Sequence, residues 1–217
     1  MSRESASDVQ IEIAATAARL IAEDGLDYAS AKRKAVEAIA GDVNGVRALI
    51  PDNALVESEL RRWLATFEGA RHVERLRALR QLALQLMQRL GAFEPHLVGA
   101  VLNGTATDHS DIRMQLFTDS AKDVEIFLLN EGVDFEVFDD KAAPGAAEEL
   151  VQFVIQPART RGMPARVGVV LAIYGRDGIR VAPRGASAEP GLHAVEASGR
   201  ASRVQLERLL DDTEPAP

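Results

Sequence analysis

The spacing of apolar residues changes near Phe93, and this change constrains the fold more than any other feature of the chain. Before Phe93, apolar side chains recur three and four residues apart, as on one face of a helix. After it, they occur in short runs separated by Gly-, Ala- and Pro-containing turns, which is typical of strands. The sequence therefore predicts an α+β protein, with an N-terminal helical bundle followed by a small mixed or antiparallel sheet domain.

Four amphipathic helices are predicted in the first ninety residues. The first ends at Gly25, the second covers Tyr28–Ala40, the third begins after Pro51, and the fourth covers residues 71–90. The fourth helix carries arginines beside its leucine face. Because charged residues beside an apolar helix face usually contact water, we expect these arginines to be solvent-exposed: Arg71, Arg75, Arg77, Arg80 and Arg89.

Short strands and one helix are predicted after Phe93. The helix starts at Ser120 and ends at Gly132, and the strands cover residues 97–102, 112–117, 133–138, 150–155 and 167–173. From Ala182 the composition is rich in Gly, Ser, Ala and Pro, which indicates a loosely ordered tail with one short helix over residues 200–210. We therefore expect three regions: a bundle over 1–91, a sheet domain over 92–182 and a tail over 183–217.

Composition excludes several classes of function. The chain has no cysteine and only four histidines, which do not have the spacing of a metal site. It has no phosphate loop of the GxxxxGK[ST] type. It has no basic-then-apolar leader and no apolar run of about 20 residues, so we expect a cytoplasmic protein without a membrane partner.

Charge is distributed unevenly along the chain, whose net charge is −8. Twelve acidic and three basic residues lie between Asp108 and Leu150, whereas six arginines and one aspartate lie between Pro157 and Arg184. Neighbouring acidic and basic blocks could hold a cation and a polyphosphate, or could be two solvated surfaces.

The segment from Leu102 to Leu116 carries the strongest functional signal. A predicted strand ends in Gly104 and Thr105, and a second begins with Ser110 and Asp111. A glycine lets the backbone approach a phosphate, and a hydroxyl can donate to it. A carboxylate at the start of the next strand can hold magnesium against that phosphate.

This layout resembles the DNA polymerase β-like nucleotidyltransferase superfamily. Its signature is an apolar strand, Gly followed by Gly or Ser, a short loop, and Asp-x-Asp or Asp-x-Glu on the next strand. Residues 103–105, 110–112 and 119–127 are more narrowly similar to a group of proteobacterial nucleotidyltransferase-like proteins. The resemblance implies a sheet domain of nucleotidyltransferase type, a nucleoside triphosphate as substrate or ligand, and Mg²⁺ as cofactor. It implies that Asp111 is the catalytic residue and metal ligand, and that nucleotide is bound by Gly104, Thr105, Ser110 and Arg113.

The chain departs from this signature at two of three carboxylate positions. Arg113 replaces the second carboxylate, and the predicted strand 167–171, which would supply the third, contains no acid. Glu125 or Glu136 could be recruited instead, and His109 could act as a general base. We expect Arg113 to form an ion pair with Asp111, which would exclude two-metal chemistry.

Three hypotheses follow. The first is a nucleotidyltransferase-like protein that binds nucleotide or nucleic-acid phosphate and has reduced or lost transferase activity. The second is an active Mg²⁺-dependent enzyme that transfers a nucleoside monophosphate to a protein, an RNA or a small molecule. The third is a protein-interaction module that uses the helical bundle.

Overall fold

The computed structural model describes residues 3–40, 49–138, 147–183, 185–187 and 189–213. The chain divides into two compact units, one of residues 1–72 with 107–109, and one of residues 73–106 with 110–217. The division therefore falls inside helix α4 (Gly69–Arg89) rather than at residue 91. Most of the fourth predicted helix belongs to the sheet unit, because its leucines are part of the sheet's core.

The first unit contains helices α1 (Arg3–Asp24), α2 (Tyr28–Ala40) and α3 (Asn53–Phe67). They share a core of small and aliphatic side chains, among them Ile13, Ala17 and Leu60. The predicted helix start after Pro51 is confirmed, since the Asp52 side chain accepts a hydrogen bond from the backbone N–H of Leu55. Within the described residues, no helix is long and apolar enough to cross a membrane.

The second unit contains a mixed sheet, as predicted. The strands are β1 (His96–Val98), β2 (Ile112–Phe117), β3 (Glu136–Phe138), β4 (Glu149–Ile155), β5 (Val167–Tyr174) and β6 (Ala201–Ser202). Among the described residues their order is β3-β4-β5-β2-β1-β6. In the part of the chain that the structure describes, β2 and β5 pair in parallel and the other neighbouring strands pair antiparallel.

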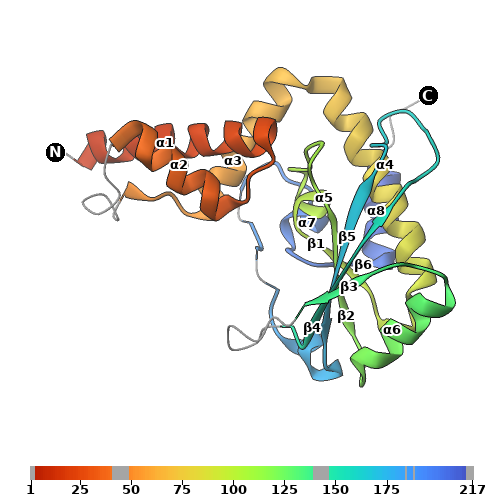
Figure 1. The fold of residues 1–217 in the computed structure, drawn as a ribbon. Helices are drawn as coiled ribbons and strands as arrows, with labels where there is room; N and C mark the ends of the chain where they lie inside the picture. The colour runs from red at the N-terminus through yellow and green to blue at the C-terminus, as the bar shows by residue number, and fades with distance from the viewer. Residues whose placement is uncertain (1–2, 41–48, 139–146, 184, 188, 214–217) are drawn as a thin grey trace. The chain divides into compact units, whose positions relative to one another are not determined.

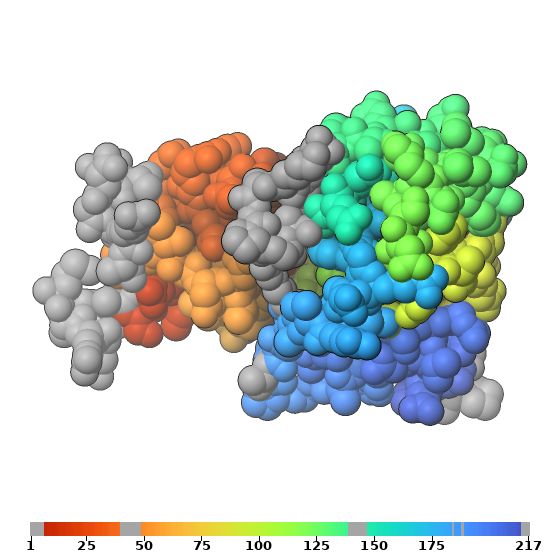
Figure 2. Space-filling view, turned by 90° about the horizontal axis from the view of Figure 1, so that it is seen from below, coloured from red at the N-terminus to blue at the C-terminus, as the bar shows by residue number. Residues whose placement is uncertain are grey.

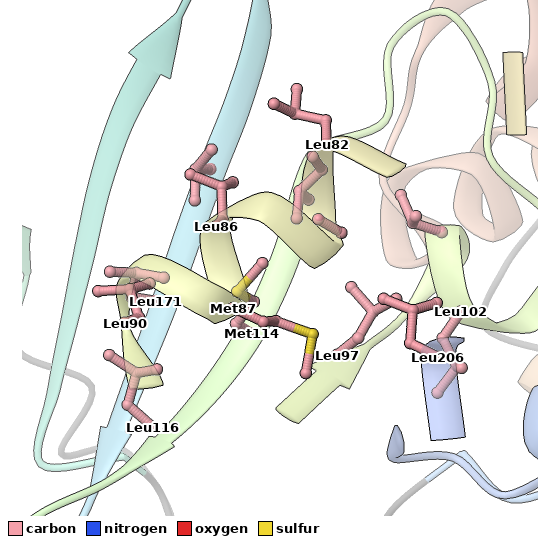
Figure 3. Close-up of a cluster of buried hydrophobic side chains, with 14 of the residues drawn as sticks. Leu82, Leu86, Met87, Leu90, Leu97, Leu102, Met114, Leu116, Leu171 and Leu206 are labelled. Carbon is pink, nitrogen blue, oxygen red and sulfur yellow. The ribbon is translucent and has the colours of Figure 1, made fainter. Parts of the chain in front are cut away.

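One face of the sheet is covered by helices α4, α6 (Ala121–Asn130) and α8 (Arg203–Asp212) (Figure 1). Alternate strand residues point to this face, and Figure 3 shows Met114 and Leu116 of β2 close to Met87 of α4 and to Leu90, the residue that follows α4. The same alternation directs the neighbouring residues of β2 to the opposite face. We call that second surface the open face.

The prediction for residues 97–102 is wrong in part. The strand β1 ends at Val98, and residues Ala100–Asn103 form the short helix α5 after Gly99, whose φ is +73°. A short apolar run fits a buried strand and a buried helix equally well, so its spacing alone does not distinguish them. The prediction for 133–138 is also too long, since β3 covers only its last three residues.

Residues 189–213 are more ordered than the tail predicted from residue 183, and the short helix predicted over residues 200–210 is confirmed as α8 (Arg203–Asp212). This segment contains α7 (Ala194–Ala197), β6 and α8, and it follows the short 3-10 helix η3 (Arg176–Arg180). Leu206 and Leu209 are fully buried in the core of the sheet unit, which accounts for the order of the segment. In Figure 2 its atoms (dark blue) adjoin those of β5 and η3 (lighter blue).

Two glycines with similar backbone angles test the packing of the 156–166 loop against α4. Gly162 (φ +79°) lies against α4, so that a Cβ there would be 2.6 Å from the carbonyl carbon of Glu74, whereas Gly132 (φ +69°) has open space around it. We expect Gly132→Ala to cost about 1 kcal/mol for the left-handed conformation alone, and Gly162→Ala to cost at least about 1 kcal/mol more because of overpacking. Urea unfolding measures both, and equal costs would contradict the packing of the 156–166 loop on α4.

Candidate functional site

Asp111 lies on the open face at the beginning of β2. In the parallel pairing of β2 with β5, Ile112 is opposite Val169, which places Asp111 beside Gly168. A Cβ built on Gly168 would lie 2.1 Å from the Asp111 Oδ1 atom. The half-buried Asp111 carboxylate therefore rests directly on the backbone of β5, in space that only a glycine leaves open.

Arg113 is exposed on the same face, two residues further along β2. It lies between Val170 of β5 and Val98 of β1, and its Cδ is 3.6 Å from the position of a Cβ on Gly99. Within the described part of the chain, Arg113 and Asp111 form no ion pair, so the expected pair is absent. The aliphatic part of the Arg113 side chain instead lies next to Gly99, the residue before α5.

Among the described residues, the strand positions next to Asp111 offer no second carboxylate. The neighbouring open-face residues of β5 are Gly168 and Val170, as the sequence indicated for that strand. Glu136 is on the open face, but β4 and β5 separate its strand from β2. Three strand spacings place it roughly 14 Å from Asp111. Among the described residues, no group of three or more His, Asp or Glu side chains could hold a metal ion.

Glu125 is also unsuited to join Asp111. It lies on α6, on the helix-covered side, and accepts a hydrogen bond from Lys122 Nζ at 2.6 Å. This bond lowers the pKa of Glu125, and a hydrogen bond with Glu149 contributes in the same direction. Glu149 is opposite Ile173, whose side chain points into the core, so these carboxylates face away from the open face.

The Gly104–Thr105 turn follows α5 rather than a strand. Gly104 ends the helix with φ +83°, and its N–H donates to the carbonyl of Ala100. Thr105 is 1% exposed, and its hydroxyl donates to Asn103 Oδ1 at 2.7 Å. The Thr105 hydroxyl, which was expected to contact phosphate, is thus buried and hydrogen-bonded within the turn. Ser110 is half-buried and immediately precedes Asp111.

A buried ion pair occupies the surroundings of Gly104. Arg80 of α4 is 3% exposed, and its Nη2 lies 2.6 Å from Glu196 Oε1 of α7. The same Glu196 oxygen would be 3.3 Å from a Cβ on Gly104. Burial lowers the pKa of Arg80, and the hydrogen bond with Glu196 opposes that shift. The Glu196 carboxylate therefore lies next to Gly104, where the sequence predicted that a phosphate would bind.

Two arginines predicted to face solvent are buried instead. Arg75 is 1% exposed and donates from Nε and Nη2 to the carbonyl of Ala106. Arg80 donates to the carbonyls of Val101 and Leu102, at 3.0 and 2.9 Å. These carbonyls lie at the end of α5 and in the following loop, where backbone donors are lacking. Nothing in the spacing of α4 separates these two arginines from Arg71 and Arg89, whose side chains are exposed.

His109, the candidate general base, and Lys32 of α2 both have structural contacts. His109 packs against the end of α1, where its ring nitrogen Nε2 lies 3.3 Å from the carbonyl of Glu23. A Cβ on Gly25 would be 2.7 Å from that ring, so Gly25 makes room for it. Lys32 donates to Asn53 Oδ1 at 2.8 Å and joins α2 to the start of α3.

Comparison of the chain with protein-family models, curated proteins and solved structures gives no match. We therefore infer function from the geometry of the sheet unit.

Removing the Arg80 side chain tests the buried ion pair. In Arg80→Met, Glu196 and two backbone carbonyls lose their partner inside the protein, so we expect a loss of about 3–5 kcal/mol in unfolding free energy. Arg89→Met on the same helix removes an ion pair with Glu131 whose partners are 59% and 36% exposed. That control should cost at most about 1 kcal/mol. Similar costs in urea unfolding would contradict a buried role for Arg80.

A double-mutant cycle tests the contact between Asp111 and Gly168. Gly168→Ala forces the carboxylate to move, and we expect this overpacking to cost about 1–3 kcal/mol. In an Asp111→Ala background the clash is gone, so the same glycine change should cost at least about 1 kcal/mol less. Additive costs in chemical denaturation would show that the carboxylate does not rest on β5.

Proposed function

We propose that this protein is nucleotidyltransferase-like and binds nucleotide or nucleic-acid phosphate, with degenerate catalytic carboxylates and reduced or lost transferase activity. The observation that carries the proposal is that Asp111 and Arg113 lie two residues apart on the open face, without an ion pair between them. Phosphoryl chemistry with two metal ions needs several carboxylates a few ångströms apart. Asp111 has Gly168, Val170 and Arg113 around it, so it is suited to at most one weak metal contact.

Arg113 is the residue best placed to contact a phosphate. It is exposed, and no carboxylate among the described residues pairs with it. A guanidinium binds phosphate oxygens in a planar, two-pronged geometry and needs no metal ion. Because Thr105 and Glu196 fill the turn after α5, the proposal assigns the phosphate contact to Arg113 and the adjoining open face, with Ser110 close by.

Thermal-shift titration tests the proposal. The four nucleoside triphosphates are added with and without Mg²⁺ to the wild-type protein and to three variants. We expect stabilisation without metal, approaching about 2.7 kcal/mol at a hundredfold excess over Kd. It should be lost in Arg113→Ala and kept in Asp111→Ala. Arg208→Ala, which removes an exposed arginine of α8, is the matched control and should behave as wild type.

Three outcomes would contradict the proposal. Stabilisation that requires Mg²⁺ and disappears in Asp111→Ala would favour an active nucleotidyltransferase. No response to any nucleotide in the wild-type protein would favour the interaction module. A loss in Arg208→Ala equal to that in Arg113→Ala would indicate unspecific attraction of anions by surface charge.

A further inference from the structure

A cavity lies at the outer edge of β4, away from Asp111. β3 pairs with β4 only along Leu150–Gln152, and among the described residues no strand lies beside Phe153–Ile155 on that edge. The cavity occupies this gap, between the edge and the C-terminal ends of α4 and α6, and has a volume of about 350 Å³. We call it the β4-edge cavity. All its lining residues belong to the sheet unit.

The walls of the β4-edge cavity are aliphatic and aromatic. Leu86 comes from α4 and Leu90 directly follows that helix, while Phe127 comes from α6 and Phe153 from β4. The volume is within the range of small-molecule sites, which are mostly apolar with few polar groups. Phenyl rings also attract cations to their faces. The walls therefore fit a hydrocarbon group of modest size, and they tolerate a positive charge beside it.

The rim of the cavity is electrostatically negative. α4 and α6 both direct their C-terminal ends to it, and a helix C-terminus carries partial negative charge. Arg89 and Glu131 on the rim form an ion pair and offset one another. Asp134, also on the rim, is exposed, and no cation among the described residues pairs with it. The Asp134 carboxylate therefore gives the opening of the cavity a net negative charge.

We propose that the β4-edge cavity binds a small organic cation, an alkyl- or arylammonium compound. Its hydrocarbon part lies between Leu90, Phe127 and Phe153, and its ammonium group lies at the rim beside Asp134. This site is independent of the proposed phosphate contact at Arg113, which is on β2, two strands away from β4. The two proposals therefore succeed or fail separately.

A pair of probes of similar shape and opposite charge tests the proposal. 2-Phenylethylammonium and 3-phenylpropionate are titrated into the ¹⁵N-labelled full chain, and amide shifts are followed by NMR. We expect the ammonium compound to shift the amides of residues 132–134 and 153–156. We expect the carboxylate compound to bind at least about fivefold more weakly, the effect of one exposed charge contact.

Variants at four positions make the test specific. Asp134→Asn should weaken binding of the ammonium probe about three- to fivefold. Asp123→Asn, at the opposite end of α6 and also exposed, should leave it unchanged, as should Asp111→Ala. Val133→Phe, which fills the cavity, should abolish binding. Since Asp134 is exposed, its variant should fold even if the cavity-filling one does not.

The proposal is overturned if the two probes bind equally well, or if neither shifts these amides. It is also overturned if the shifts occur elsewhere in the chain. An effect of Asp123→Asn as large as that of Asp134→Asn would mean that the net charge of the protein attracts the probe, without a defined site.

Discussion

Two buried guanidinium groups on α4 hold the centre of the sheet unit together. Arg75 and Arg80 donate to the carbonyls of Val101, Leu102 and Ala106, in the segment between β1 and β2. Buried carbonyls without donors are costly, so this irregular segment can stay inside the protein only because the arginines satisfy it. The next residues of the chain lead to Asp111. The position of the candidate site therefore depends on contacts made by α4, which contributes no residue to the open face.

The arrangement of strands determines which groups surround Asp111 and where the β4-edge cavity forms. Parallel pairing of β2 with β5 brings Gly168 and Val170 next to Asp111 and Arg113, and this leaves a single carboxylate beside a cation. At the other side, β3 is too short to cover the whole of β4, so a cavity remains between the strand edge and two helix ends. We therefore propose phosphate for the first surface, which presents the guanidinium of Arg113, and an ammonium group for the second, which presents the Asp134 carboxylate and two helix C-termini.

Much of the framework could be predicted from local patterns. The start of α3 at Asp52 and the strands β2, β4 and β5 agree with the predictions, because capping residues and alternating apolar residues act over a few positions. The contacts of the candidate site were harder to predict from the sequence. Thr105 had the right residue type for a phosphate contact, yet its hydroxyl bonds to Asn103, two residues away. The burial of Arg75 and Arg80 left no local signal, since it depends on carbonyls that lie more than twenty residues later in the chain.

The sequence alone determined the α+β class, the change of pattern near Phe93, an arginine at position 113 and the absence of acidic residues in 167–174. These properties depend on residue types and their short-range spacing. Only the tertiary structure decided that α4 belongs to the sheet unit, that residues 100–103 form a helix, and that Glu196 pairs with Arg80 beside Gly104. Each of these depends on which distant groups share a buried space, where unpaired polar atoms must find partners. That requirement involves the whole unit, and no single segment of the chain contains it.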